Sequence, residues 1–420
     1  MKKISIIGSG TSGMLAAHGL KDRGFDVTVY SDRTADDWLN NSVPTGTAFL
    51  YESNIQIERD CGIEYWQDDA FHGHGVLLDF QPTKGADRLV VNGLLHGTRG
   101  AAIDIRKRVH RWMNDFEKAG GLINYGAVSV DQLEGIAAES DLTLLSAGKS
   151  DIASVVPRDA ERSVYSKPQR NLAMILVEGV DKIAGDRVDY TPIKFNFFGD
   201  AGEYFWVPYT HKSGKHVWCV LFEAKEGGYM DRFGDAETAE QACEIAKQLI
   251  KDVAPYEYDY IQDMYPVEGD AHCWLKGRFP PTVRKAFGKT SRGDVVVPIG
   301  DSAITFDPIG EQGGNCSQKN TWHWVQALAA RGDLPYAETW LSDTWESFWS
   351  KHGKAAYTFN NILLEPLTEA GQTILFAASQ NRDFADTAFF GNFHSPTNFF
   401  PWFEDTGAAN SKIEMFAKAS

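Results

Sequence analysis

The stretch that decides the fold is KKISIIGSGTSGMLAAHGLKDRGFDVTVYSD, residues 2–32. A short apolar run opens it, and a glycine-rich turn follows. Helical periodicity then extends from about Thr11 to Arg23, where Gly24 ends the helix. The apolar run DVTVY comes next as a second strand. The stretch therefore predicts one β-α-β unit at the start of the chain.

The turn in this unit has the spacing GxGxxG, with glycines at positions 8, 10 and 13. Directly after a strand and before a helix, this spacing lets backbone amides hold a pyrophosphate, as in Rossmann-like folds. An acid about 20 positions further on usually binds the ribose, and Asp32 lies at that distance. It stands one position later than a strand-terminal acid would, so Ser31 is expected to share the task. The predicted cofactor-binding residues here are Gly8, Gly10, Thr11, Ser12, Gly13, Ser31, Asp32 and Arg33.

The alternative for these glycines is a tight turn with no ligand. Dinucleotide binding is favoured because the three glycines and the acid fit the motif together.

Length and composition restrict the class of protein. The 420 residues exceed the usual size of one core and predict two or three units. Hydrophobic residues make up 43% and charged residues 23%, which is typical of a globular protein. The net charge of -16 opposes binding to nucleic acid or to an anionic membrane surface.

The five cysteines are odd in number, scattered and never spaced as CxxC, so neither a disulfide framework nor a zinc site is predicted. The first ten residues lack a cleavage-like site, and no run of 18 apolar residues occurs. A cytoplasmic location, without a metal or a membrane partner, is expected.

Further along the chain, residues 38–100 are rich in Gly, Pro and aromatic residues without a sustained period. They are expected to wrap a site rather than to build a core. From about residue 166, long alternating segments predict a largely antiparallel second sheet, with a hairpin near Ser213 and Gly214. The chain after Gln318 is mostly helical in pattern.

A second motif, GDSAITFDPIGEQGGN at residues 300–315, resembles the GD-box of flavoprotein monooxygenases. In that motif an Asp meets the ribityl-phosphate region of FAD, and a P-x-x-G-Q-G-x-N turn approaches the flavin ring. The resemblance therefore implies FAD as the dinucleotide. The matching residues, and so the expected FAD contacts, are Asp301, Pro308, Gln312, Gly313, Gly314 and Asn315.

Further segments resemble the styrene monooxygenase and indole monooxygenase family along almost the whole chain. They read AIDIR, LSAGKSD, RSVYSKPQR, GEYFWVP, GRFPPTVRKAFG and FFPWFED. The resemblance implies the oxygenase component of a two-component monooxygenase, which takes reduced FAD from a separate NAD(P)H:flavin reductase. With O2 it would form a flavin C4a-hydroperoxide and epoxidise or hydroxylate a small aromatic, indole-like or styrene-like.

The predicted architecture is α/β, with a discontinuous Rossmann-like FAD-binding domain and an inserted antiparallel substrate domain. Residues 1–165 and 286–330 form the two parts of the first, residues 166–285 form the second, and residues 331–420 form a helical C-terminal section. The active site is expected at their junction.

An external source of reduced flavin has independent support. Self-sufficient aromatic hydroxylases carry a DG pair after the strand that corresponds to DLTLLSAG, whereas this chain reads GKSD at residues 148–151. The sequence also contains no second GxGxxG. Gly148 stays an expected FAD contact.

The substrate pocket is expected to be apolar and aromatic, because excluding water from it favours oxygen transfer over peroxide release. The segments FHGHG (71–75) and 205–208 are candidates for its wall. The predicted catalytic or substrate residues are Thr45, Phe49, His74, Phe205 and Pro308.

Three sets of residues have competing interpretations. His74 matches a family histidine near the substrate, but a hydrogen-bonded structural role is slightly favoured. Arg106 reaches a flavin phosphate or forms a surface ion pair, and both alternatives stay open. Trp322 and Trp324 resemble the start of the tryptophan halogenase signature without its completing Ile-Pro, so they are interpreted as core residues.

Two positions depart from the family pattern. Ser42 and Thr45 stand where the styrene enzymes have an arginine and an asparagine. Glu311 replaces the first glycine of the G-Q-G turn, where a charge facing the flavin would disfavour the anionic reduced form. An outward side chain, with the flexible positions moved to the neighbouring glycines, is the provisional interpretation.

Two alternative functions remain. One is a self-sufficient NAD(P)H-dependent aromatic hydroxylase of the same fold. The other is a flavin-binding protein without oxygenase activity. The oligomeric state, with a homodimer among the alternatives, is left open.

Overall fold

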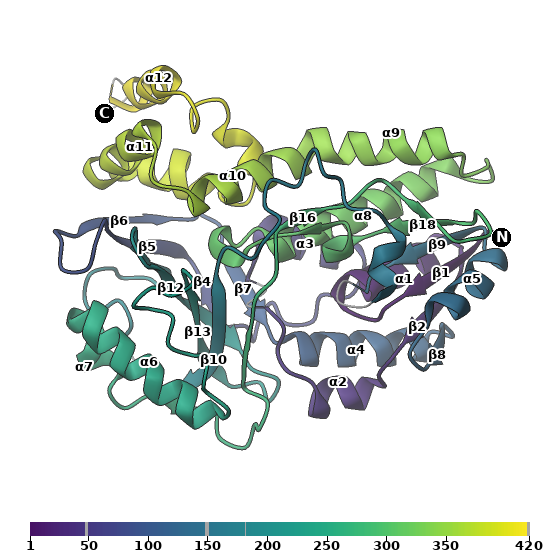
Figure 1. Ribbon diagram of the computed structural model, residues 1–420, viewed down its shortest axis with the longest axis horizontal. Helices are drawn as coiled ribbons and strands as arrows, with labels where there is room; N and C mark the ends of the chain where they lie inside the picture. The colour runs from purple at the N-terminus through teal and green to yellow at the C-terminus, as the bar shows by residue number, and fades with distance from the viewer. Residues whose placement is uncertain (47–48, 148–150, 181, 418–420) are drawn as a thin grey trace.

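The computed structural model describes residues 1–46, 49–147, 151–180 and 182–417. Two sheets lie side by side along the long axis of the molecule, and helices cover both (Figure 1). The fold is α/β, as predicted. None of the helices within the described ranges is long and apolar enough to cross a membrane.

The first sheet has the order β17-β18-β9-β1-β2-β8, and all of its pairs are parallel except β17 with β18. Its strands are β1 (Lys3–Ile7), β2 (Asp26–Ser31), β8 (Leu122–Tyr125), β9 (Leu142–Leu145), β17 (Gly288–Lys289) and β18 (Val295–Pro298). Because β18 pairs with β9, a late segment of the chain completes a sheet that the N-terminus begins. This is the discontinuous arrangement that the two motifs predicted.

Helices lie on both sides of the first sheet (Figure 1). The predicted first helix is confirmed as α1, which packs against α4 and α8. Asp104 caps α4 by accepting a hydrogen bond from the Arg106 amide at 3.0 Å. The helices and short turns of this half are α1 (Thr11–Asp22), α2 (Ala35–Asn41), α3 (Glu52–Asp60), α4 (Ile105–Lys118), α5 (Val130–Ala138), η1 (Asp151–Val155), η3 (Gly300–Ser302), α8 (Gly313–Arg331) and α9 (Glu338–Phe348).

The second sheet has eleven strands, with the path β14-β10-β13-β12-β11-β5-β6 and with β15, β3, β4 and β7 attached to it. The predicted hairpin is β12 and β13, whose turn contains Ser213 and Gly214. The strands are β3 (Phe49–Tyr51), β4 (His72–Gly73), β5 (Gly75–Gln81), β6 (Leu89–Leu94), β7 (Gly100–Ile103), β10 (Asn171–Glu178), β11 (Pro192–Phe198), β12 (Gly202–Thr210), β13 (His216–Ala224), β14 (Tyr265–Pro266) and β15 (Trp274–Gly277). A small separate ladder pairs β16 (Thr282–Val283) with β19 (Ile304–Thr305).

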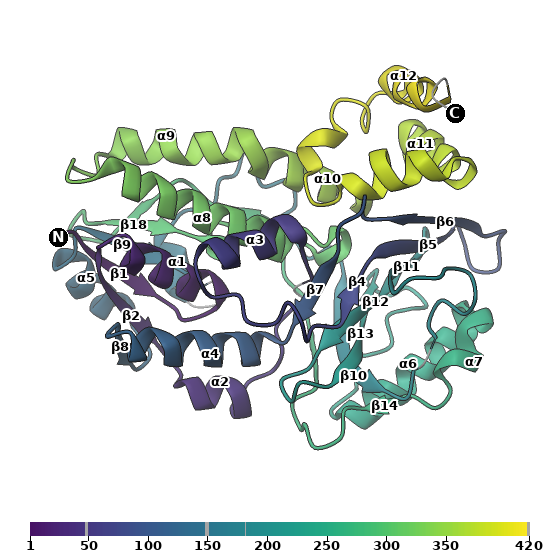
Figure 2. The same cartoon turned by 180° about the vertical axis from the view of Figure 1, so that it is seen from behind.

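Side chains on the second sheet alternate between two buried faces. Phe205 and Val207 pack with the C-terminal helices, whereas Tyr204 and Trp206 pack with α6 on the opposite face. Figure 2 shows the sheet between these two layers. The second layer contains α6 (Ala239–Val253), η2 (Pro255–Glu257) and α7 (Tyr258–Ile261).

The expectation that residues 38–100 would only wrap a site is wrong. Within this stretch, β3 to β7 join the second sheet, and α2 and α3 lie beside the first. Strand β5 pairs in parallel with β11, a partner more than a hundred residues away. Such pairing leaves a weak local signal, because short strands separated by Gly and Pro resemble loops until their distant partners are known.

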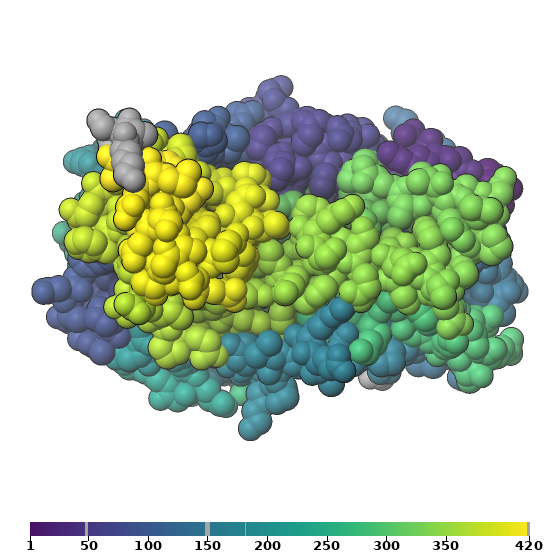
Figure 3. Space-filling model, turned by 90° about the horizontal axis from the view of Figure 1, so that it is seen from above, coloured from purple at the N-terminus to yellow at the C-terminus, as the bar shows by residue number. Residues whose placement is uncertain are grey.

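The C-terminal section is helical, as predicted, and forms much of the face seen in Figure 3. Thr397 donates to the Lys351 carbonyl at 3.0 Å, which ties its later turns to its first ones. Its elements are η5 (Trp349–Gly353), α10 (Lys354–Leu364), α11 (Glu369–Gln380), η6 (Phe384–Phe389), η7 (Phe390–Asn392), η8 (Pro396–Phe399) and α12 (Thr406–Ala417).

Candidate functional site

The turn between β1 and α1 packs too tightly for side chains at two of its three glycines. A Cβ on Gly13 would lie 2.0 Å from the Gly8 carbonyl oxygen, and one on Gly8 would lie 2.8 Å from the Ser146 carbonyl oxygen. Around Gly10, by contrast, a Cβ would meet nothing within 4 Å, and Gly10 caps α1 without a side-chain hydrogen bond. The amides at the start of α1 therefore face an open approach, which fits the pyrophosphate of a dinucleotide.

At the end of β2, the structure separates Ser31 from Asp32. The Ser31 hydroxyl is fully buried, lies 2.6 Å from the Ser9 hydroxyl and donates to the Arg33 carbonyl at 2.5 Å. Asp32 is exposed and lies 3.5 Å from the Arg33 guanidinium, which in turn stacks over the Trp38 ring. The Ser31 hydroxyl therefore holds the glycine turn in place, and Asp32 is the better candidate for a ribose contact.

The segment 300–315 begins against α1. Gly300 has a φ of 61°, and a Cβ there would lie 2.1 Å from the Ser12 hydroxyl oxygen. Asp301 is exposed and accepts a hydrogen bond from the Ser317 hydroxyl. The two predicted FAD motifs therefore come together in space, with Gly300 against Ser12 at the start of α1 and Asp301 next to it in the chain.

Two predicted FAD contacts in this segment use their side chains to build the turn. The Gln312 amide donates to the carbonyls of Gly310 at 3.0 Å and Phe393 at 3.1 Å. The Asn315 amide donates to the Phe49 carbonyl at 2.9 Å. Both side chains are buried. They connect the turn to the C-terminal section and to β3. Any hydrogen bond from these two residues to a cofactor would therefore come from their backbone.

The start of α8 is a second open helix end. This helix begins at Gly313, and the residue before it makes no capping side-chain hydrogen bond. Gly313 is half-buried and Gly314 is exposed, while Pro308 is half-buried and begins the preceding turn η4 (Pro308–Gly310). Backbone amides that lack a capping partner can donate hydrogen bonds to the acceptor atoms of a flavin ring.

The provisional interpretation of Glu311 is wrong. Its side chain is only 6% exposed, so it does not turn outward. Its backbone has φ 52° and ψ 29°, the left-handed conformation that favours glycine, so the strained position has not moved to a neighbouring glycine. Burial, followed by the Glu311 charge, raises the pKa of the Tyr51 hydroxyl and of the Cys219 thiol. Glu311 therefore lies against the second sheet.

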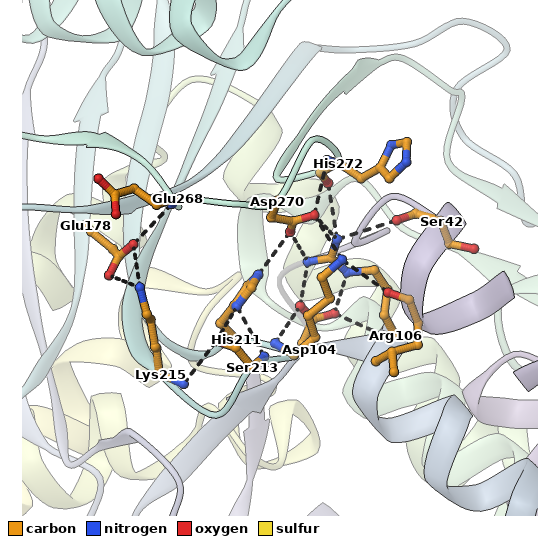
Figure 4. A network of polar contacts seen from close by, with 12 residues as sticks. Ser42, Asp104, Arg106, Glu178, His211, Ser213, Lys215, Glu268, Asp270 and His272 are labelled. Carbon is orange, nitrogen blue, oxygen red and sulfur yellow. Dashed lines mark hydrogen bonds and ion pairs between the residues drawn. The ribbon is translucent and has the colours of Figure 1, made fainter. Parts of the chain in front are cut away.

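Arg106 matches neither of its two predicted roles. It is 0% exposed, so it is no surface ion pair. Its guanidinium donates to Asp104 at 2.7 and 2.9 Å and to Asp270 at 3.1 Å, and it also approaches the carbonyls of Ser42 and His272 (Figure 4). These contacts occupy its donors, which leaves none for a phosphate. Arg106 instead joins α4 to the loops of the second half.

The candidates in the early loops lie in different surroundings. Phe49 is buried, and Cβ atoms on Gly73 and Gly100 would touch its ring. Thr45 is half-buried, and residues 47 and 48 lie outside the described ranges. His74 is exposed, its amide donates to the Thr191 carbonyl and its carbonyl accepts from the Leu95 amide, and its two interpretations stay predictions. Burial, followed by the charges of nearby basic groups, lowers the pKa of this histidine.

An apolar cavity of about 110 Å³ lies between the second sheet and the C-terminal helices. The turn η4 contributes Ile309 and Gly310 to its wall, so the cavity borders the segment that carries the second motif. Phe205 lies in the layer behind the cavity wall, with its ring centroid 4.7 Å from that of Phe195. The phenylalanines of the wall are Phe80, Phe195, Phe197, Phe198, Phe359, Phe389, Phe393 and Phe403.

Sequence reasoning missed most of this wall. The segment FHGHG contributes nothing to it, because Phe71 packs against His216 and Trp218 and so lies with the layer of α6. The alternating phenylalanines of IKFNFF (193–198) and the aromatic density of residues 389–403 were the available signal. Of the other expected contacts, Gly148 lies outside the described residues. Trp322 and Trp324 are buried core residues, as predicted.

Residues 148–259 match the family model described as the substrate-binding domain of styrene monooxygenase A. The chain is 24% identical to styrene monooxygenase StyA of Pseudomonas fluorescens over 343 residues, which cover 80% of each protein.

Two solved structures share the fold over nearly their whole length. The flavin-dependent brominase Bmp2 has a TM-score of 0.67 at 14% identity, and the match covers 100% of both chains. A flavoprotein/dehydrogenase from Cytophaga hutchinsonii has a TM-score of 0.66 at 13% identity, covering 99% of both.

The fold is therefore one that flavin-dependent enzymes share, and the paired open helix ends fit FAD as the cofactor. Among proteins of that fold, the chain is similar to styrene monooxygenases, in residues 148–259 by the family model and over 80% of its length by the comparison with StyA.

Proposed function

We propose that this chain is the oxygenase component of a two-component FAD-dependent monooxygenase that epoxidises or hydroxylates a small aromatic, indole-like or styrene-like. One observation carries the proposal: the phenylalanine-lined cavity shares the wall residues Ile309 and Gly310 with the turn that leads into the open end of α8. An aromatic in the cavity would therefore lie beside a flavin held at that end.

The chain's residues fit FAD as the cofactor. The amides of Thr11 and Ser12 at the open end of α1 would hold the pyrophosphate, and Asp32 would hold the ribose of the adenosine. Asp301 would meet the ribityl-phosphate region, and the amides of Gly313 and Gly314 would meet the flavin ring. Reduced FAD, when bound, supplies the two electrons with which one atom of O2 enters the substrate and the other leaves as water.

The protein's own contribution is positioning and the exclusion of water. Apolar side chains form most of the cavity wall, and the described part of the chain holds no cluster of three or more residues suited to a metal ion. Water that reached the reaction would favour release of peroxide over oxygen transfer. The phenylalanine wall would keep it out and would hold a flat ring by edge-to-face contacts.

External supply of reduced FAD is supported by the sequence, which contains one GxGxxG and replaces the DG pair with GKSD. The partner would then be a separate NAD(P)H:flavin reductase, which is the second component of the proposed two-component monooxygenase. Oxidation of NADPH by this protein alone, stimulated by a substrate, would instead identify a self-sufficient hydroxylase.

The test mixes anaerobic protein and chemically reduced FAD with oxygenated buffer and follows the flavin spectrum with and without indole. A long-lived oxygenated flavin that decays faster with indole and yields an oxidised product is the expected result. Immediate reoxidation to FAD and peroxide, unaffected by a panel of aromatics, would contradict the proposal and favour a flavin-binding protein without oxygenase activity.

A matched pair of variants tests the cofactor site separately. Gly10→Ala adds a methyl group where the protein itself has no atom within 4 Å, so the fold is kept but the phosphate approach narrows. We expect its affinity for FAD, measured by fluorescence titration, to fall by about tenfold or more. Gly135→Ala, in α5 and equally open, is the control and keeps the wild-type affinity.

A further inference from the structure

One end of the phenylalanine-lined cavity carries buried charged groups that the proposed chemistry does not use. Arg170 and Glu203 both belong to the cavity wall. The Arg170 guanidinium donates to the two carboxylate oxygens of Glu203 at 2.6 and 3.4 Å. Both side chains are buried, with Glu203 only 3% exposed. A charged pair is therefore built into an otherwise apolar wall.

A second glutamate lies directly opposite Glu203. Glu223 pairs with Glu203 across the antiparallel strands β13 and β12, so the two side chains share one face of the sheet. Glu223 is 0% exposed, no N–H or hydroxyl group of the described residues donates to it, and its carboxyl group lies within hydrogen-bond reach of the Asp307 carboxyl group. Like charges directly opposite each other on a sheet are destabilising, so this arrangement has a cost that packing alone does not explain.

Asp307 adds a third carboxyl group to this cluster, which we call the acidic end and define as Arg170, Glu203, Glu223 and Asp307. Burial, followed by the charges of Asp307 and Glu203, raises the pKa of Glu223 well above its usual range. Burial also raises the pKa of Asp307, against the opposing charge of Arg170. Three buried carboxyl groups face one guanidinium, so carboxyl groups are in excess at the acidic end.

Among the other charged groups of the cavity wall, Lys225 acts on the acidic end, since burial raises the pKa of Glu203 to about 7 against the charges of Arg170 and Lys225. Lys225 is half-buried and donates to the Gly199 carbonyl at 2.7 Å. Glu365 is exposed and accepts a hydrogen bond from the Tyr165 hydroxyl at 2.6 Å. One lysine and one glutamate cancel, and the excess of carboxyl groups at the acidic end remains.

The buried cluster on the opposite face of the same sheet shows what a structural ion pair looks like here. Lys194 contacts both Asp79 and Glu257, while Arg187 and Arg88 lie 2.9 and 3.8 Å from Asp79, so three cations face two carboxylates. That cluster lies beneath α6 and away from the cavity. The acidic end differs in both respects, because its carboxyl groups outnumber its cations and it borders the cavity.

From this difference we infer that the acidic end binds a protonated amine, so that the preferred substrate is a small aromatic carrying a cationic amine. The aromatic body would occupy the phenylalanine wall, and the ammonium group would donate to Glu203 from inside the cavity. An uncharged hydrocarbon of the same shape leaves these carboxyl groups without a counter-charge. That the amine is a substrate rests on the proposed function, whereas its binding at the acidic end does not.

The test compares two probes that differ only in charge at one end: 4-vinylbenzylamine and 4-ethylstyrene, in which a methyl group replaces the ammonium. Calorimetry or intrinsic tryptophan fluorescence measures their affinities for the protein loaded with oxidised FAD. At pH 7.5 we expect the amine to bind about tenfold more tightly or better. Equal or tighter binding of 4-ethylstyrene overturns the inference.

Proton release gives a second readout that a purely structural acidic end would not show. A bound cation favours the ionised form of nearby carboxyl groups, so binding of 4-vinylbenzylamine should release protons into solution. The measured heat should then depend on the ionisation enthalpy of the buffer, phosphate against Tris. Amine binding with no buffer dependence contradicts the role of the acidic end.

Two glutamine variants locate the effect. Glu203→Gln should reduce the preference for the amine to about threefold or less, because it removes the charge that reaches the cavity. Glu226→Gln, an exposed residue after β13, should leave it unchanged. If a folded Glu203→Gln protein keeps the full wild-type preference for 4-vinylbenzylamine over 4-ethylstyrene, the assignment of Glu203 as the amine-binding carboxylate is overturned. Because all of these are binding measurements, they stand even if the reduced-FAD experiment shows no oxygen transfer.

Discussion

Two buried ionic clusters in this protein differ in charge balance and in what surrounds them. In the first, Asp104 and Asp270 face Arg106 (Figure 4), and Lys212 lies 3.0 Å from Asp270. Two carboxylates thus meet two cations, and the cluster fills the junction between α4 and the β12–β13 hairpin. In the second, the acidic end, three carboxyl groups meet one guanidinium beside a cavity. The balanced cluster holds the two halves together, and the unbalanced one is suited to a ligand.

The largest effect on stability is expected when a cation is removed from the first cluster. Arg106→Met leaves two buried carboxylates with one close cation, which should lower the free energy of unfolding by about 3–5 kcal/mol in chemical denaturation. The control is Arg111→Met, which removes an exposed pair with Asp115 and should cost ~1 kcal/mol at most. Equal losses in the two variants would show that the Arg106 cluster is not structural.

The balanced cluster should stabilise the protein only where Asp270 is ionised. Although burial acts to raise it, hydrogen bonds from His211, Arg106 and Lys212 hold the pKa of Asp270 well below its usual range. The stabilisation is therefore present above the ordinary carboxyl pKa and is lost as the pH falls through the lowered one. Asp270→Asn should cost about 2–3 kcal/mol at pH 7 and less at acid pH, by urea denaturation. A cost that grows on acidification would contradict this sign.

The acidic end should show the opposite dependence on pH. Because burial raises the pKa of Glu223, folding opposes its ionisation, and the cost appears as the pH rises above the ordinary carboxyl pKa. Glu223→Gln keeps the shape of the protonated side chain, so it should stabilise the protein at pH 8 by on the order of 1–2 kcal/mol and change little near pH 4. Glu226→Gln, which is exposed, should show no such trend. Destabilisation at pH 8 would mean that Glu223 is ionised and paired.

The smallest effect concerns the turn that joins Asp307 of the acidic end to the start of α8. Glu311 holds a left-handed conformation that glycine adopts without strain. Glu311→Gly should therefore raise the free energy of unfolding by about 0.5–1 kcal/mol, seen as a higher denaturation midpoint. A lower midpoint would show that the contacts of the buried carboxylate outweigh the strain.

The parts of the fold that could be predicted are those with a strong local pattern. The β-α-β unit follows from apolar runs around three glycines, and α6 follows from a helical stripe with a capping box at Thr238 and Gln241. Strands β3 to β7 were missed because they are short and their partners are distant in the chain. The identity of the cavity's phenylalanines was missed for the same reason, since Phe195 and Phe393 meet only across the second sheet and the C-terminal section.

By itself, the sequence determined the class of cofactor site, because the spacing of glycines and the acid is a local property that the backbone carries into the fold. It also determined the two-sheet α/β architecture through periodicity. Only the tertiary structure decided which charges are balanced. Arg106 lies in a basic run of the sequence, yet its partner Asp270 comes from a distant loop, and Glu203 meets Glu223 only through strand register. Electrostatic energy depends on distance in space and on burial, and neither can be read from residues that are adjacent in the sequence.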